Sequence, residues 1–118
     1  MTDPAPSAGL SGSSQQLLIG IARSESGFEQ LVNVFLDAGV PGGTVIESRG
    51  LASILREELP IFSGLAALLP AASGSRVLLA IAPAAAADTA LRFARQLPAS
   101  DRPIIAALPL AGSVLPGD

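Results

Sequence analysis

The side chains that carry most enzymatic chemistry are missing from this chain. It has no His, Cys, Tyr or Lys, and its charged residues are seven Arg and ten Asp or Glu. Without His or Cys there is no Ser-His-Asp triad, no thiol nucleophile and no ordinary zinc site. Without Lys there is no Walker-type phosphate loop and no Schiff base. The neighbouring carboxylates of Glu57 and Glu58 diverge by about 100° on a helix, so they form no acid–base dyad. We therefore expect a protein that is not an enzyme.

The charge pattern excludes two classes of partner. The formal net charge is −3, and the arginines are scattered along the chain, at Arg23, Arg49, Arg56, Arg76, Arg92, Arg95 and Arg102. Nucleic-acid binding needs a clustered basic surface, which this spacing does not provide. The apolar runs are shorter than the roughly 18 residues that span a bilayer. Residues 1–14 also lack the basic and apolar regions of a secretory signal. We expect a cytoplasmic protein that enters no membrane.

Four strands and two helices are expected within residues 15–110. Apolar runs predict strands over 15–22, 44–50, 76–82 and 103–110. Between 23 and 39 apolar residues recur with helical spacing, Ser26 and Glu29 fit a capping box, and Gly39 suits a C-cap. A second helix is expected after Pro83, because proline suits the first helical position. Residues 1–14, rich in Pro, Ser and Gly, are expected to be a disordered tail, and 111–118 a C-terminal tail.

The order of these elements, βαββαβ, predicts an α+β protein with a ferredoxin-like split βαβ fold. Such a fold has an antiparallel sheet with both helices on one face. Because the predicted strands are apolar, the other face also needs a cover. The cover has to come from residues 50–75 or from another subunit, so we expect an oligomer.

Residues 50–75 form a long insertion between the second and third strands. Connections of this length are uncommon and are usually functional. The insertion is apolar: its spacing predicts a short amphipathic helix over 52–59, ended by Pro60, and a further helical turn at 63–69. We expect it to pack on the open sheet face or on a neighbouring subunit.

The run DAGVPGGTVIESRGL (37–51) resembles the nitrogen-regulatory P-II family. In that family the first helix ends at a Gly, a Gly-x-Thr-Val step opens the second strand, and an acidic-x-basic-Gly step leads into a long T-loop. Here these steps are Gly39, Gly42–Val45 and Glu47–Gly50. The matching element order covers residues 15–110, and residues 58–65 and 104–110 look most like the divergent P-II-like branch.

The resemblance implies a homotrimer that binds adenine nucleotides or other small effectors between its subunits and offers the T-loop to a partner protein. Carried onto this chain, the ligand-binding positions that it implies are Gly42, Gly43, Thr44, Gly50 and Leu51. The first three would come from one subunit, and Gly50 and Leu51 from its neighbour. Arg49, which can meet an anion in the cleft, and Arg102, near the position of the family's phosphate loop, are added as candidate ligand-binding residues. Glycines permit close approach, and backbone amides with a threonine hydroxyl can bind an adenine edge or a phosphate.

Two departures from the family pattern limit the range of ligands that this chain is expected to bind. The family's Gly-Asp-Gly-Lys phosphate loop is replaced here by residues 98–105, which contain neither Gly nor Lys, and the T-loop tyrosine is absent. Triphosphate binding is therefore not expected, and a nucleoside monophosphate, an uncharged ligand or no ligand remain open. Plainer interpretations also remain open: Gly42 and Gly43 can form a simple turn, and Glu47 and Arg49 a cross-strand or intersubunit ion pair.

Three functions remain open. The leading expectation is a P-II-like signal-transduction protein, a trimeric small-molecule sensor that acts on its partner through residues 50–75 by allostery. The alternative is a structural or interaction trimer that binds no ligand and keeps residues 50–75 permanently packed. An enzyme resembling the CutA trimers, which share the fold class, is disfavoured because metal-linked and catalytic side chains are missing. No cofactor is certain, no metal is expected, and an adenine nucleotide is the candidate ligand.

Overall fold

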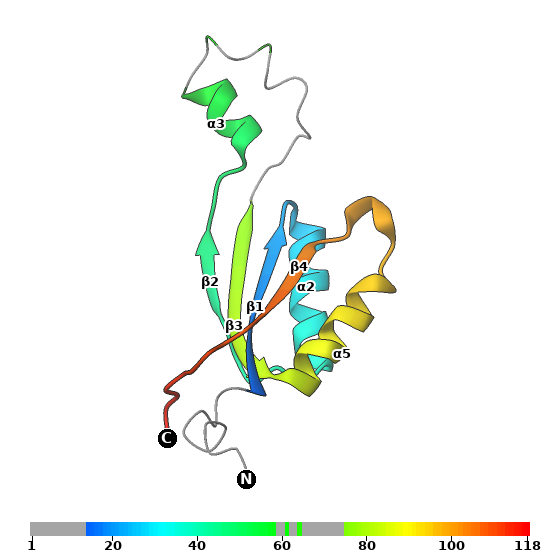
Figure 1. The fold of residues 1–118 in the computed structure, drawn as a ribbon. Coiled ribbons are helices and arrows are strands. Elements are labelled where there is room, and N and C mark those ends of the chain that lie inside the picture. Colours follow the sequence, from blue (N-terminus) through cyan, green and yellow to red (C-terminus); the bar gives the residue numbers. More distant parts are fainter. Residues whose placement is uncertain (1–13, 59–60, 62–63, 65–74) are drawn as a thin grey trace.

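A computed structural model describes residues 14–58, 61, 64 and 75–118 (Figure 1). Its elements, in chain order, are β1 (Gln15–Ala22), α2 (Glu25–Asp37), β2 (Thr44–Glu47), α3 (Leu51–Glu57), β3 (Arg76–Pro83), α5 (Ala84–Arg95), the 3₁₀ helix η3 (Ala99–Asp101) and β4 (Ile104–Pro109). All but η3 correspond to predicted elements. The expected disordered tail and the expected helical turn at 63–69 fall largely outside the described residues.

The four strands form one antiparallel sheet in the order β2-β3-β1-β4. In its centre, Ile19 of β1 lies opposite Leu79 of β3 on one side and Ala106 of β4 on the other. The predicted α+β class and the antiparallel sheet are confirmed. The predicted extent of the second strand, 44–50, is wrong: β2 ends at Glu47, because Gly50 already serves as the N-cap residue of α3.

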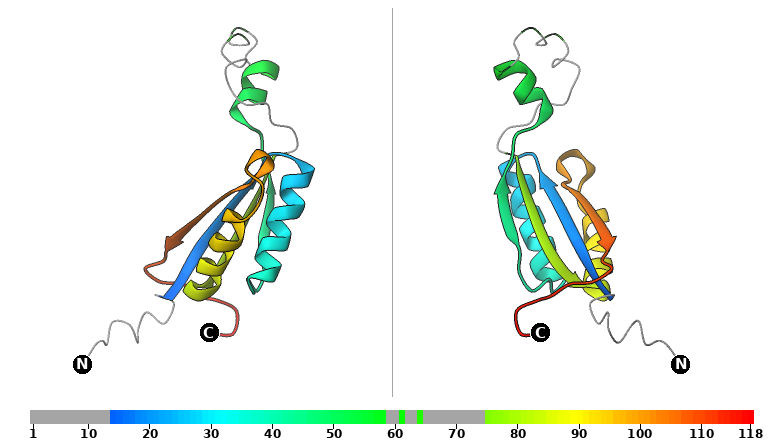
Figure 2. Two further views of the ribbon diagram at one scale, coloured as in Figure 1. Left: turned by 90° about the vertical axis from the view of Figure 1, so that its right-hand side faces the viewer. Right: turned by 60° about the vertical axis from the view of Figure 1, so that its left-hand side comes forward.

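Both α2 and α5 lie on the same face of the sheet, and the core lies between them and the strands (Figure 2). Alternate strand residues point into this layer and are buried, namely Leu18, Ala22, Leu78, Ala80 and Ala82. They meet Leu31 and Phe35 of α2 and the small residues Ala87 and Ala90 of α5. Leu31 is fully buried, and the burial of such a side chain contributes about 1.5–3 kcal/mol.

The ends of α2 show one wrong and one confirmed prediction. The predicted capping box is wrong: the N-cap is Ser24, whose Oγ accepts a hydrogen bond from the amide of Gly27 at 2.9 Å. An N-cap residue needs extended backbone, which Ser24 has (φ −152°, ψ 164°), whereas Ser26 and Glu29 already lie inside the helix. At the other end the expected positive φ of Gly39 is confirmed, at +82°, but the C-cap residue is Ala38, one position earlier than predicted.

The second face of the sheet is apolar and largely uncovered by the described residues. It carries the strand residues that alternate with the buried set, namely Leu17, Ile19, Ile21, Thr44, Ile46, Val77, Leu79, Ile81, Ile104, Ala106 and Leu108. We call these residues the open face. The helix α3 projects beyond the end of the sheet and does not cover them (Figure 1).

The C-terminal segment covers one corner of the open face, which the sequence had not indicated. It crosses the sheet near the start of β1 (Figure 2), and Leu115 and Pro116 line a hollow together with Leu17 and Ile81. The expectation that only residues 50–75 or another subunit can cover this face is therefore wrong in part.

Candidate functional site

The start of β2 brings the chain unusually close to β3. A Cβ atom built on Gly43 would lie 2.9 Å from Cδ1 of Leu78 and 3.0 Å from the carbonyl oxygen of Leu79, whereas one built on Gly42 would meet no atom within 4 Å. Distances near 3 Å leave no room for a methyl group unless the neighbour moves. Gly43 is therefore required by close packing, and Gly42 is not.

A hollow of about 850 Å³ lies on the open face beside these glycines. It is lined by Leu17, Pro41, Gly42, Gly43, Thr44, Leu79, Ala80, Ile81, Leu115 and Pro116. Its size is in the range of small-molecule sites, roughly 300–1,000 Å³. Among the described residues, the lining has the Thr44 hydroxyl and main-chain groups beside apolar side chains and no charged residue. It suits a largely apolar ring with a few hydrogen-bonding groups better than it suits a polyphosphate.

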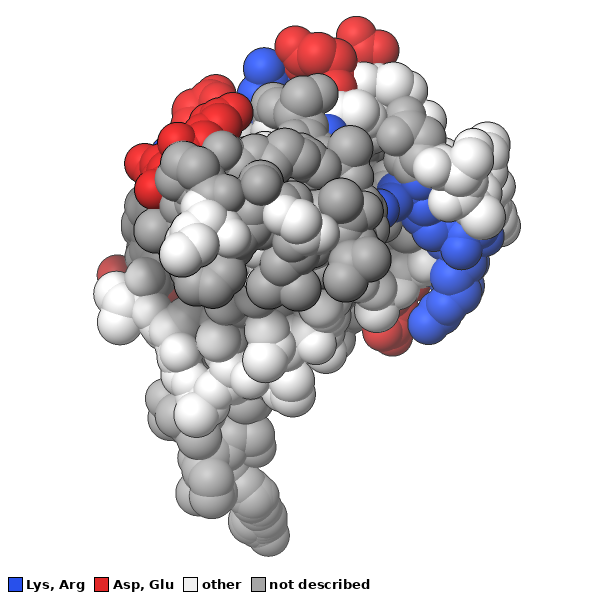
Figure 3. Space-filling view, turned by 90° about the horizontal axis from the view of Figure 1, so that it is seen from above, with Lys and Arg blue, Asp and Glu red and all other residues white. Residues whose placement is uncertain are grey.

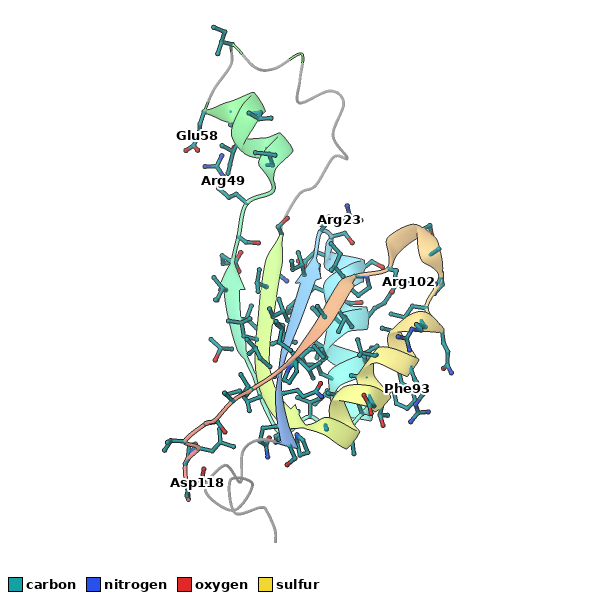
Figure 4. The ribbon with its side chains drawn as sticks, viewed as in Figure 1. Arg23, Arg49, Glu58, Phe93, Arg102 and Asp118 are labelled. Carbon is teal, nitrogen blue, oxygen red and sulfur yellow. The ribbon has the colours of Figure 1, made fainter. Side chains whose placement is uncertain are left out.

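The far end of β2 is held by ion pairs. One terminal nitrogen of Arg49 lies 2.7 Å from Oε1 of Glu57, and the other lies 2.8 Å from Oε1 of Glu58 (Figure 4). The hydrogen bond to Glu58, together with the charges of both carboxylates, raises the pKa of Arg49 although partial burial opposes this. Arg49 is therefore an ion-pair residue, but the expected cross-strand or intersubunit pairing is wrong for it, because its partners lie in the α3 region of the same chain. These contacts join the end of β2 to the C-terminal end of α3.

Within one chain, the two groups of predicted ligand-binding residues stand apart. Thr44 opens β2, and Gly50 follows Glu47, the last residue of β2, by three positions, so six residues of extended chain separate them by roughly 20 Å. Leu51, the first residue of α3, is exposed. The structure therefore does not bring Gly42–Thr44 and Gly50–Leu51 together in a single subunit, and the resemblance had assigned them to two.

Arg102 lies before β4, on the side of the molecule opposite to β2 (Figure 4). Its guanidinium donates to the carbonyl oxygen of Leu97 at 2.6 and 3.2 Å and to that of Arg95 at 3.3 Å. These carbonyls follow the last turn of α5, where a cation is favourable. Its position at the other edge of the sheet keeps Arg102 away from the hollow beside Gly42 in the same chain.

A further charged cluster surrounds Arg76 at the start of β3, and no sequence pattern indicated it. Arg76 makes two hydrogen bonds to the carboxylate of Glu25, at 2.8 and 3.2 Å, and lies 3.5 Å from Glu47. Its guanidinium carbon also lies 4.7 Å from the ring centre of Phe28. The hydrogen bond to Glu25 is the main reason why the pKa of Arg76 is raised. No local pattern could reveal a pair 51 residues apart, so this cluster depends on the fold.

A second hollow was also missed, between α2 and α5 on the side away from the sheet. It measures about 700 Å³ and is lined by Gln30, Asn33, Val34, Asp37, Phe93, Gln96 and Leu97. The polar residues of α2 in this set follow helical spacing, which the sequence could have shown. The Oε1 atom of Gln30 is buried there and has no hydrogen-bond partner in residues 14–58, 61, 64 and 75–118.

Charge and metal-ligating groups are dispersed over the described residues. Seen from above, acidic side chains lie along one margin and a group of Arg side chains lies at another, so neither sign covers this view (Figure 3). In residues 14–58, 61, 64 and 75–118 no three metal-ligating side chains come together. None of the helices in the described part of the chain has the length and apolar character needed to cross a bilayer.

Comparison with known proteins found no matching family model and no matching curated protein. Function is therefore inferred from the geometry above.

Proposed function

We propose that the chain is a P-II-like regulatory protein, a trimer of ferredoxin-like subunits that binds a small effector at the start of β2 and acts on a partner through residues 50–75. The observation that carries this proposal is the antiparallel strand order β2-β3-β1-β4 with α2 and α5 on one face. A split βαβ fold is expected to have this arrangement. The long insertion between β2 and β3 also falls where the family has its T-loop.

The proposed effector carries an adenine-type ring and few charges. The Thr44 hydroxyl and the main chain of Gly42 and Gly43 supply hydrogen-bonding groups, while Leu79 and Ile81 supply an apolar wall. A phosphate would need a cation from elsewhere, because no charged side chain of the described part of the chain lines this hollow. AMP and cyclic AMP are therefore the favoured ligands, and ADP and ATP gain nothing from their extra phosphates.

Isothermal titration calorimetry with ATP, ADP, AMP and cyclic AMP tests this choice. Thr44→Val keeps the shape of the side chain and removes its hydroxyl, so it should weaken binding about tenfold, the effect of losing one hydrogen bond of about 1.4 kcal/mol. Thr89→Val is the matched control, because the Thr89 hydroxyl donates to the Ala85 carbonyl within α5. Flat titrations with all four nucleotides would remove nucleotide sensing from the proposal.

The proposed mechanism uses β2 as the link between effector and loop. Thr44, at its first position, lines the hollow, and Arg49, two residues beyond its last, holds Glu57 and Glu58 of the α3 region. An effector that binds better when these ion pairs are formed shifts the population of residues 50–75 toward that arrangement. By linkage, a partner that prefers the same arrangement strengthens effector binding equally.

The proposal of a trimer is based on the exposed apolar residues of the open face. Ile46, Ile104 and Leu108 are 45%, 50% and 46% exposed there, and contiguous apolar surface of this kind marks an interaction site. Light scattering should give about 35 kDa, three copies of the 11.8 kDa chain. Ile104→Glu on the open face should lower this mass, while Val114→Glu, at a residue 91% exposed, should not. A monomer in the unmodified protein contradicts the trimer.

A structural trimer with permanently packed residues 50–75 is the second candidate, and the paired contacts of Arg49 favour it. Both acceptors, Glu57 and Glu58, have exposed side chains, so a protease that cleaves after glutamate can probe them. A switching segment should be cut readily, and effector should slow the cleavage. Cleavage that is slow and independent of every ligand supports the structural trimer instead.

A further inference from the structure

The strand β2 forms one free edge of the sheet, since β3 is its only neighbour among the described strands. The amide of Ser48 donates to the carbonyl of Ser75 at 2.9 Å, which makes this pair a hydrogen-bonded one. Such pairs alternate along an antiparallel ladder. It follows that Thr44 and Ile46 direct their main-chain groups to β3, whereas Val45 and Glu47 direct theirs outward.

The outward groups of Val45 and Glu47 bond to no other described residue. Exposed edges are usually blocked by proline, by lysine or by a bulge. β2 has the sequence TVIE, without proline, lysine or a bulge; it is short, and its one charged residue, Glu47, stands at its last position. The edge therefore has main-chain donors and acceptors in the spacing that an added strand requires.

An apolar hollow lies directly beside this edge, on the helix side of the sheet. It measures about 220 Å³ and is lined by Val32, Phe35, Leu36, Val40, Gly42, Gly43, Val45 and Leu78. Leu36 and Val45 are 67% and 47% exposed. The hollow is smaller than typical small-molecule sites, roughly 300–1,000 Å³, so its size fits one apolar side chain rather than a cofactor.

The charge at the β2 edge further limits which partner can bind there. The Glu47 side chain is 81% exposed and lies 3.5 Å from Arg76, which makes closer contacts with Glu25. Opposite charges that face each other across two strands are stabilising, and like charges are destabilising. A second copy of β2 offers Glu47 no basic residue within the strand, so a segment of another protein fits better.

We propose that the β2 edge binds an extended segment of a partner protein as an added antiparallel strand. The partner's main chain bonds to Val45 and Glu47. Residues opposite each other project from the same face, so the partner residue opposite Val45 places an apolar side chain at the hollow. The partner residue opposite Glu47 lies two positions earlier and is basic. The recognised pattern is therefore Lys or Arg, any residue, then a large apolar residue, and it depends neither on the effector site nor on the trimer.

Amide NMR with synthetic peptides tests this proposal on the full chain. The probe is the blocked heptapeptide Thr-Lys-Thr-Leu-Thr-Val-Thr, and its controls carry Glu in place of Lys or Ser in place of Leu. The probe should shift the amide signals of Val45 and Glu47 and slow their hydrogen exchange. Each control should bind more weakly. Ser in place of Leu should weaken binding about tenfold, because the apolar contact is lost. Glu in place of Lys should weaken it by more than roughly 1.5- to 5-fold, because the charge pair is replaced by two like charges.

Two variants distinguish peptide binding at the β2 edge from an unspecific effect of a new surface charge. Leu36→Glu places a charge at the rim of the hollow, on an exposed residue, and should abolish the preference for Leu over Ser in the probe. Val114→Glu, at another exposed apolar residue, should keep it. The proposal is overturned if millimolar probe leaves the Val45 and Glu47 amides unchanged. It is equally overturned if these amides become protected without probe as the protein concentration rises, because a second copy then occupies the edge.

Discussion

Replacing Gly43 by alanine tests the close approach of β2 to β3 on which the candidate site depends. The new methyl group would lie 2.9 Å from Cδ1 of Leu78 and 3.0 Å from the Leu79 carbonyl oxygen. The Leu78 side chain can rotate away, but the carbonyl belongs to a central strand and moves only with the sheet. Gly42→Ala is the matched control, because its methyl group would meet nothing within 4 Å.

Two opposing contributions set the change in the free energy of unfolding that Gly43→Ala should cause. Overpacking costs about 1–3 kcal/mol. Restricting the unfolded chain by exchanging Gly for Ala returns about 0.4–1 kcal/mol. Gly43→Ala should therefore lower the free energy of unfolding by about 1–2 kcal/mol, whereas Gly42→Ala should leave it unchanged or raise it slightly. For a domain of this size 1 kcal/mol corresponds to roughly 4–5 °C in melting temperature.

Thermal and urea unfolding followed by circular dichroism measure both variants against the unmodified protein. We expect Gly43→Ala to melt about 4–10 °C lower and Gly42→Ala to melt at the original temperature or above it. If both variants have the same melting temperature, Gly43 is not required for the close approach of β2 to β3, which contradicts the prediction. Effector titrations on the same samples show whether the hollow is altered along with stability.

Three further predictions concern the elements that position the site. Ser24→Ala should lower the free energy of unfolding by about 1 kcal/mol, because it removes the N-cap of α2. Ser26→Ala should change it by less than about 0.5 kcal/mol. Equal losses for the two variants in urea unfolding would contradict the assignment of Ser24 as the N-cap. Arg102→Gln should cost about 0.5–1 kcal/mol because it removes the donors at the end of α5, whereas Arg92→Gln, which loses a contact to a hydroxyl, should cost less in the same assay. Leu31→Ala should cost about 2–5 kcal/mol in the fully buried core, and calorimetric unfolding that shows a loss below 1 kcal/mol would mean that the helix layer is loosely packed.

Much of the local structure could be predicted because its causes are local. Apolar residues repeat every three or four positions in α2, and Gly39 can take the positive φ that ends this helix. The position of the N-cap was less predictable, since Ser24 and Ser26 are both good capping residues. What separates them is the backbone conformation of the chain as it leaves β1, and residue type does not encode that.

The candidate site was predictable in part. The glycines before β2 followed from residue types close together in the chain, whereas the partners of Arg49, Glu57 and Glu58, were not predicted. The role of Arg102 did not, because its acceptors are main-chain carbonyls at the end of α5, which any sequence would offer. The hollow beside Gly42 was also hidden, since its walls come from β1, β3 and the C-terminal segment as well as from the start of β2.

The sequence by itself determined the order of the main helices and strands, the place of the long insertion and the absence of His, Cys and Lys chemistry. These features depend on residue type and on spacing within a few positions. Only the tertiary structure decided that Arg76 joins Glu25 to Glu47, that the C-terminal segment reaches the open face, and that β2 has a free edge beside an apolar hollow. Each of these joins residues far apart in the chain. Such contacts form when the burial of the whole core fixes strand order and register, and no short stretch of sequence carries that information.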